Sequence, residues 1–305
     1  MTPPKTLVMI CGPTASGKTS LSVELAKVFQ TEILSADSRQ FYKEMSIGTA
    51  KPDSDEMEGV PHHFIGHLSV KEEYNVSAFE KDSLDLLNRL FQKRSVQIMV
   101  GGSGLYLKAV SLGIDELPDP HPALRDELNE IFSVKGIKPL QERLKKLDPE
   151  YYSEVDKNNP KRLMRAIEVC ETSKKKYSEL RKAEPKSRPF RTIKIGLEMP
   201  REELFERIHQ RTDQMIDDGL VEEVRSLKPY QSYNALNTVG YKEIFRYLGK
   251  EISLEQAITD IKTNTRRYAK RQITWFKKDN EIKWFHPKDK DIIIDYIKSI
   301  LKNKA

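Results

Sequence analysis

The stretch Gly12-Pro-Thr-Ala-Ser-Gly-Lys-Thr19 follows the apolar run TLVMIC at residues 6–11 and precedes a helical pattern of apolar residues that ends near Phe29. A buried strand, a glycine-rich turn and an amphipathic helix in this order are typical of a phosphate-binding loop. Its backbone N–H groups and the helix N-terminus bind phosphate oxygens, Lys18 adds a positive charge, and the Thr19 hydroxyl is placed to bind Mg²⁺. The residues predicted to bind phosphate are Gly12, Pro13, Thr14, Ala15, Ser16, Gly17, Lys18 and Thr19.

Further strands and helices alternate after this loop. Residues 32–36 and 96–100 are short apolar runs typical of buried strands, and a helix that begins at Asn75 or Ser77 separates them. The stretch 48–66 contains glycine, proline and many charges and predicts a long loop. Strands that alternate with helices predict an α/β fold, a parallel sheet flanked by helices.

The pattern changes at residues 115–190, which are polar and almost entirely helical in their spacing. Prolines lie at both ends of this segment, and each breaks a helix or restrains the residue before it. Strand character returns at 192–198, and the rest is helical apart from a short apolar stretch around Trp284. We predict a split α/β core of residues 1–114 and 191–305 that carries an all-helical insertion at 115–190.

Composition limits the class of protein. The 305-residue chain has a net charge of +6 and a pI near 9.0, which only slightly favours a nucleic-acid or anionic partner. Cys11 and Cys170 match no metal-ligand spacing and fit a reducing cytoplasm. The adjacent His62 and His63 do not present one face to a metal and are interpreted as loop residues. No apolar run approaches the roughly 18 residues of a membrane span, so we expect a cytoplasmic protein.

A phosphate loop does not by itself identify the substrate. Its default ligand is a nucleoside triphosphate, so a kinase of a nucleoside or small metabolite is one prediction. The strand at 96–100 runs into Gly101 and Gly102 where a hydrolase would carry an acidic pair, and no guanine-reading Asn-Lys-x-Asp occurs, which argues against a motor ATPase or GTPase. Asp37 follows the strand at 32–36, at the sheet edge where ligands bind. It could hold Mg²⁺, cap a turn or accept a proton.

The segment 262–278 interleaves basic and aromatic residues and contains no acid. Its cations are Lys262, Arg266, Arg267, Lys270, Arg271, Lys277 and Lys278. Such a helix can follow a phosphate backbone while its aromatic residues stack or pack. Alternatively, its charges are only solvated. A second basic group with helical spacing is formed by Lys161, Arg162 and Arg165.

Several ordered blocks of sequence resemble the bacterial-type tRNA dimethylallyltransferases, also called tRNA isopentenyltransferases. They are GPTASGKT at 12–19, SADSRQ-Y at 35–42, IGTAKP at 47–52, VGGSGLY at 100–106, NPKRLMRA at 159–166, GLVEEV at 219–224, TVGYKE at 238–243 and YAKRQITWFKK at 268–278. The resemblance implies transfer of a dimethylallyl group from dimethylallyl diphosphate to N6 of the adenine 3′ to the anticodon. It also implies Mg²⁺, a monomer, and the anticodon stem-loop of tRNA as partner. A P-loop kinase and an RNA-binding protein with a vestigial loop are the alternatives.

The resemblance also implies roles for individual residues. Asp37 would accept the N6 proton, while Lys18 and Arg211 would bind the diphosphate, whose negative charge grows as the C–O bond breaks. Ser103 stands where many family members carry threonine beside the adenine, which must leave its stack to react. Trp275 is expected to be structural. The implied tRNA contacts are Asp37, Ser38, Arg39, Gln40, Ser103, Arg125, Lys161, Arg162, Leu163, Arg165, Arg266, Arg267, Lys270 and Arg271.

Overall fold

The computed structural model describes residues 4–119, 121–182 and 184–302. The chain forms two compact units, one made of Met1–Ser111 with Arg188–Ala305 and the other of Leu112–Ser187. We call the first the core and the second the insertion and describe each by itself. The segment predicted as the insertion, 115–190, covers most of the second unit.

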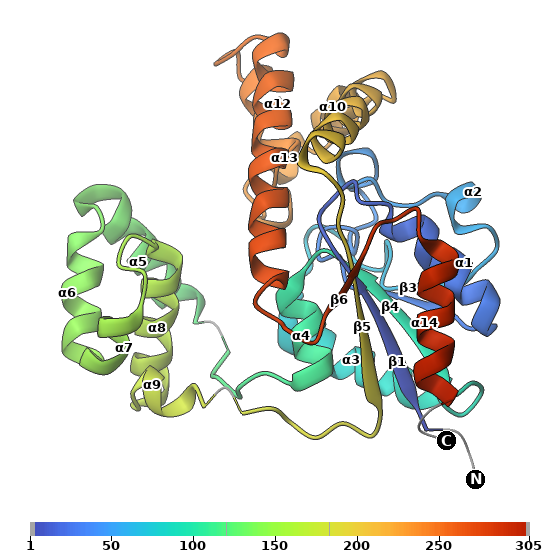
Figure 1. The fold of residues 1–305 in the computed structure, drawn as a ribbon. Coiled ribbons are helices and arrows are strands. Elements are labelled where there is room, and N and C mark those ends of the chain that lie inside the picture. The colour runs from blue at the N-terminus through green and yellow to red at the C-terminus, as the bar shows by residue number, and fades with distance from the viewer. Residues whose placement is uncertain (1–3, 120, 183, 303–305) are drawn as a thin grey trace. The chain divides into compact units, whose positions relative to one another are not determined.

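The core is built on a six-stranded sheet with the strand order β3-β2-β4-β1-β5-β6, in which every neighbouring pair is parallel (Figure 1). The strands are β1 (Thr6–Cys11), β2 (Ile33–Ser35), β3 (His62–His63), β4 (Val96–Gly101), β5 (Arg191–Leu197) and β6 (Lys283–Phe285). The apolar runs of β1 and β4 are buried along their whole length, as expected of strands covered on both faces. The predicted α/β fold with a parallel sheet is confirmed.

Helices cover both faces of this sheet. The helices of the core are α1 (Lys18–Phe29), α2 (Ser54–Met57), α3 (Val76–Leu90), α4 (Gly104–Leu112), α10 (Arg201–Asp217), α11 (Leu220–Ser226), α12 (Tyr241–Leu248), α13 (Leu254–Phe276) and α14 (Lys290–Lys302), with short 3₁₀ turns η1 (Ile47–Thr49), η2 (Lys228–Tyr230) and η3 (Asn234–Leu236). Side chains alternate along β1. Val8 and Ile10 pack with α1 and α14, whereas Leu7 and Met9 pack with α3, α4 and the helices after β5 (Figure 1).

The stretch 48–66 was wrongly predicted to be one long loop. It contains α2 and the edge strand β3, in which His62 and His63 pair with Ile33 and Leu34 of β2. The His63 Nε2 lies 2.6 Å from a carboxylate oxygen of Glu32, which fixes the edge of the sheet. A strand of two residues is too short to show an alternating pattern, so the sequence carried no periodic signal for it.

The insertion is all helical in its regular structure (Figure 1). Its helices are α5 (Pro122–Lys135), α6 (Lys138–Leu147), α7 (Pro149–Glu154), α8 (Pro160–Ser173) and α9 (Tyr177–Leu180). Prolines begin α5, α7 and α8, where the missing N–H costs no hydrogen bond. Leu128, Leu140, Leu144 and Leu163 are fully buried in a hydrophobic core of its own.

Every helix within residues 4–119, 121–182 and 184–302 is too short or too polar to cross a membrane.

Candidate active site

The phosphate loop joins the carboxyl end of β1 to the first turn of α1. Gly12 has a φ of 149°, and a Cβ there would lie 2.9 Å from the Leu197 carbonyl oxygen. Gly17 has a φ of 82° and caps α1 in the left-handed conformation that glycine tolerates best. The Lys18 Nζ donates a hydrogen bond to the Pro13 carbonyl oxygen at 2.6 Å, so its side chain curls back over the loop.

The loop also carries hydroxyl groups suited to phosphate and a hydrated cation. The Ser16 Oγ is buried and makes no hydrogen bond among the residues described. Thr19 is partly exposed in the first turn of α1, next to Lys18. No cluster of three or more histidine, cysteine or acidic side chains in the described chain could hold a metal. Mg²⁺ keeps several waters and commonly binds phosphate oxygens with one or two protein oxygens, so a single Thr19 hydroxyl suits it.

Asp37 lies just after β2, at the carboxyl edge of the sheet. Its Oδ1 accepts a hydrogen bond from the Arg39 backbone N–H at 3.1 Å, which is the predicted turn-capping interaction. No hydrogen bond or ion pair within the described chain reaches its Oδ2. The half-buried carboxylate therefore caps a turn with one oxygen and leaves the other available.

Lys18, Arg211 and Asp37 come together from three different elements. Burial lowers the pKa of Lys18 to about 8, and the charge of Arg211 lowers it while that of Asp37 raises it. Burial also lowers the pKa of Arg211, against the opposing effect of Asp37. The Arg211 guanidinium donates to the Thr14 Oγ1 and the Ala50 carbonyl oxygen, both at 3.4 Å. The three residues predicted to be catalytic thus share one electrostatic environment beside the loop.

Two residues next to the loop were not among the predicted site residues. The buried Gln272 of α13 accepts a hydrogen bond from the Thr14 backbone N–H at 2.9 Å. Arg207, one helical turn before Arg211 on α10, has its Nη1 3.9 Å from the Cβ position of Gly17. For Gln272, the available signal was its place on the apolar face of α13. Buried residues lie three positions before it and four positions after it. The four-residue spacing from Arg211 was the signal for Arg207.

Residues after β2 and β4 complete the edge of the sheet. The Ser38 backbone N–H donates to the Ser103 Oγ at 3.1 Å, and the two hydroxyl oxygens lie 3.2 Å apart. The Arg39 guanidinium instead donates to the carbonyl oxygens of η3, both at 2.9 Å. The Gln40 side-chain amide donates to the carbonyl oxygens of Thr49 and Ala50. Ser103 therefore bonds the residue that follows Asp37 in the chain, while Arg39 and Gln40 hold neighbouring segments of the core.

The cations of α13 form no ion pair with any described residue at the four positions predicted to contact tRNA. The Arg266 guanidinium lies 5.5 Å from the centre of the Phe205 ring, and that of Arg271 lies 5.8 Å from the Tyr268 ring. Arg267 and Lys270 are exposed, and no carboxylate of the described chain pairs with any of the four. The helix thus presents unneutralised positive charge.

Trp275 follows these cations on α13. A Cβ at Gly104 would lie 2.2 Å from the indole Cδ1, so the ring packs directly over this glycine. The indole also remains 43% exposed. This contact ties the end of α13 to the start of α4 and is consistent with the structural role expected of Trp275.

The cations of the insertion differ in whether they are free to bind an anionic partner. Arg125 donates two hydrogen bonds to the carboxylate of Glu168, which is buried, and Arg165 lies 3.5 Å from the same carboxylate. Lys161 and Arg162 are exposed and carry no ion pair in the described structure. Leu163 has no exposed surface. Its side chain belongs to the core of the insertion, and its position does not support the predicted contact with tRNA.

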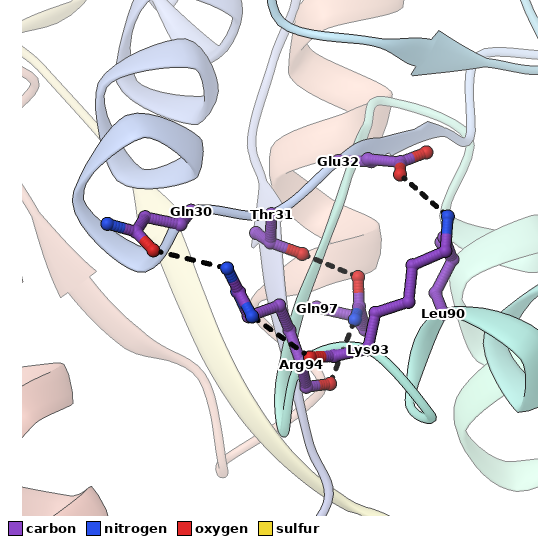
Figure 2. A pocket seen from close by; sticks show the side chains of 7 residues that line it. All are labelled: Gln30, Thr31, Glu32, Leu90, Lys93, Arg94 and Gln97. Carbon is purple, nitrogen blue, oxygen red and sulfur yellow. Dashed lines mark hydrogen bonds and ion pairs between the residues drawn. The ribbon is translucent and has the colours of Figure 1, made fainter.

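A polar pocket lies at the opposite edge of the sheet, near the amino ends of β2 and β4 (Figure 2). Its lining residues are Gln30, Thr31, Glu32, Leu90, Lys93, Arg94 and Gln97. Figure 2 shows that these polar side chains bond one another: Thr31 with Gln97, Arg94 with Gln30 and Lys93 with Glu32. Ligands of open α/β sheets bind at the carboxyl edge, so we assign this pocket no part in the chemistry.

Comparison with known proteins places the chain in a family. A family described as IPP transferase matches residues 40–279. The tRNA dimethylallyltransferase of Christiangramia forsetii is 52% identical over 96% of this chain and 97% of its own length. That of Cytophaga hutchinsonii is 48% identical over 98% of both.

Solved structures agree with this assignment. The full-length tRNA isopentenylpyrophosphate transferase of Bacillus halodurans superimposes with a TM-score of 0.73, at 35% identity and 98% coverage of both chains. A eukaryotic dimethylallyltransferase acting on tRNA gives a TM-score of 0.76 at 28% identity, over 93% of this chain and 74% of its own. This chain belongs to the IPP transferase family.

Proposed function

We propose that this chain transfers a dimethylallyl group from dimethylallyl diphosphate to N6 of the adenine 3′-adjacent to the anticodon in tRNA, releasing diphosphate. The observation that carries the proposal is the meeting of Lys18, Arg211 and Asp37 beside the phosphate loop. Two cations suit a leaving diphosphate, and one carboxylate suits a departing proton. The relatives named tRNA dimethylallyltransferase support the same reaction.

The donor binds through its diphosphate. Backbone N–H groups of the loop and the N-terminus of α1 accommodate phosphate oxygens. Lys18 and Arg211 stabilise the negative charge that develops on the leaving oxygen as the bond to the allyl carbon breaks. Mg²⁺ held by the Thr19 hydroxyl would neutralise further charge on the same diphosphate. Burial strengthens each of these interactions because it excludes water.

The acceptor reacts after it has left the anticodon stack. The N6 nitrogen attacks the allyl carbon, a C–N bond forms, and the C–O bond to the diphosphate breaks. The N6 proton passes to Asp37, whose Oδ2 has no partner within the described chain and whose Oδ1 is held by the Arg39 N–H. This hydrogen bond holds the carboxylate through Oδ1 and leaves Oδ2 to accept the proton. The hydroxyl groups of Ser38 and Ser103, which lie 3.2 Å apart, provide polar contacts for the base.

The unpaired cations of α13, with Lys161 and Arg162 of α8, provide contacts for the tRNA backbone. Arg125 serves mainly to hold Glu168, and Arg165 bonds the Pro118 carbonyl oxygen at 2.7 Å beside the same carboxylate. The family resemblance favours a cytoplasmic protein that is a monomer, and light scattering of the purified protein tests its oligomeric state.

The decisive experiment incubates the purified protein with unmodified tRNA, Mg²⁺ and labelled dimethylallyl diphosphate. We expect label in the RNA, on the adenine beside the anticodon. A tRNA with guanine at that position is the matched control and should stay unlabelled. A parallel reaction with labelled ATP tests the kinase alternative. Phosphate transfer from ATP to a nucleoside, with no prenyl label in RNA, would refute the proposed function.

A further inference from the structure

We infer that Gln272 is a positioning residue that couples the basic helix α13 to the phosphate loop and to the turn after β4. The inference rests on the proposed function, because the reaction it concerns is the prenyl transfer proposed above. It assigns a role to a side chain whose two hydrogen bonds are made to backbone groups of the loop and of the turn after β4. Gln272 lies immediately after Arg271, so the tRNA-facing and loop-facing sides of α13 meet at adjacent residues.

Both ends of the Gln272 amide are engaged. Its Oε1 accepts a hydrogen bond from the Thr14 backbone N–H at 2.9 Å, and its Nε2 donates to the Gly102 carbonyl oxygen at 3.0 Å. The side chain is buried, so neither bond has bulk water as a ready substitute. A carboxylate lacks the donor and an aliphatic chain lacks both groups, so an amide is specifically suited to this position.

The turn after β4 is shaped around this contact. A Cβ at Gly102 would lie 2.3 Å from the Gln272 Nε2, and a Cβ at Gly101 would lie 2.4 Å from the Ala36 carbonyl oxygen. The backbone of the turn is therefore packed between α13 on one side and the segment that leads into Asp37 on the other. A continuous set of contacts thus runs from Gln272 through Gly102 and Gly101 to the residue before Asp37.

Gln272 also acts on the part of the site that binds dimethylallyl diphosphate. The Thr14 backbone belongs to the phosphate loop, and the Thr14 Oγ1 accepts a hydrogen bond from Arg211. Loss of the Gln272 acceptor leaves the Thr14 N–H without its partner and loosens the loop next to Arg211. Because α13 also carries the unpaired cations, a tRNA that orders this helix orders the loop through Gln272. Donor binding and tRNA binding are then coupled, and each strengthens the other.

The test compares Gln272→Leu and Gln272→Glu with a control on the same helix. Gln256→Leu is the control because the exposed Gln256 bonds Asp260 through its Nε2, and no other described residue accepts from this atom. We expect Gln272→Leu to lower kcat/KM for dimethylallyl diphosphate by about 10-fold or more, as for loss of a buried hydrogen-bond partner. The affinity for tRNA in the absence of donor should stay within about twofold, because no group that binds phosphate is removed. Gln272→Glu should raise the KM for the donor above that of Gln272→Leu, because its charge repels the diphosphate.

Amide hydrogen exchange gives a second measurement that needs no turnover. In Gln272→Leu the peptide that contains Thr14 should exchange faster than in the wild-type protein, and in Gln256→Leu it should not change. Addition of tRNA should slow exchange of this peptide in the wild-type protein but not in Gln272→Leu. Wild-type donor kinetics in Gln272→Leu, or unchanged exchange at Thr14, would overturn the inference.

The two proposals can fail separately. If the wild-type protein places no prenyl group on tRNA, the proposed function is wrong, whereas the exchange experiment still tests the coupling between α13 and the loop. If Gln272→Leu does not fold, Gln272→Glu preserves the side-chain shape and the acceptor for Thr14. A donor KM in Gln272→Glu equal to that of the wild-type protein would then contradict the inference.

Discussion

The core and the insertion each bring two cationic side chains to one carboxylate, but only the insertion pairs them. There, Arg125 donates two hydrogen bonds to the buried Glu168, and Arg165 lies close to the same carboxylate. In the core, Asp37 receives no hydrogen bond from either of its cationic neighbours, which donate to carbonyl and hydroxyl oxygens instead. Two cations and one carboxylate thus form a closed cluster in one unit and an open one in the other.

This difference distinguishes charged side chains that stabilise the fold from charged side chains that are available to bind a ligand. A buried carboxylate needs a partner, because an isolated buried charge is costly, so the cations around Glu168 are committed to the fold. Cations that lie beside a carboxylate without pairing to it keep their charge available for an anionic ligand. Such groups show pKa values shifted by burial and neighbouring charge, as Lys18 does, and these shifts are frequent at catalytic sites.

The largest effect is expected from removing the carboxylate of the open cluster. Asp37→Ala should lower turnover by roughly 10²-fold or more, because the N6 proton loses its acceptor, while tRNA binding is retained. Asp156→Ala is a matched control, since the Asp156 Oδ1 caps a turn in the same way by accepting from the N–H two residues later. Single-turnover rates and tRNA binding measure the two effects. Near-normal turnover in Asp37→Ala would remove Asp37 from the mechanism.

The closed cluster should respond in stability and not in chemistry. Arg125→Ala leaves the buried Glu168 with Arg165 as its remaining cation and should lower the free energy of unfolding by about 2 kcal/mol. The rate per folded molecule should change little. Lys161→Ala, on the exposed surface of α8, is the control and should stay within about 0.5 kcal/mol. Urea denaturation measures both variants, and equal stabilities would show that the Glu168 pair is not structural.

The open cluster should also be visible in the pH dependence of donor use. Because burial lowers the pKa of Lys18 to about 8, its ammonium is present below this pH and is lost above it. The kcat/KM for the donor should therefore fall as the pH rises through about 8, approaching a tenfold change per unit. Affinity for tRNA alone should not change in this range. In Lys18→Arg the decline near pH 8 should disappear from the residual activity, since arginine keeps its charge.

The smallest effects concern tRNA affinity. Replacing Arg266 and Arg267 together with alanine should weaken binding and reduce the slope of log K against log salt by about 0.7 for each phosphate that the two arginines neutralise. Arg125→Ala should leave this slope unchanged, because its guanidinium is already committed to Glu168. Filter binding over a range of salt concentrations measures both. A wild-type slope in the double variant would mean that the charges of α13 are only solvated.

Much of the fold could be predicted where the signal is local. The run at 6–11, the glycine-rich turn and the helix after it follow one another in the chain, and the structure reproduces them as β1, the loop and α1. The edge strand β3 was missed, since its two residues become a strand only by pairing with β2. Gln272 was missed for the same reason, because its partners lie 258 and 170 residues away.

The sequence by itself determined the parallel α/β core, the phosphate loop and the family, because these rest on periodicity and on motifs whose residues are neighbours in the chain. It did not decide which cations are available. Arg125 and Arg266 both stand on polar helices, yet one is held by Glu168, 43 residues away, and the other lies over the ring of Phe205. Only the tertiary structure sets these partners, because a charge is neutralised by whatever group packing brings within a few ångströms of it.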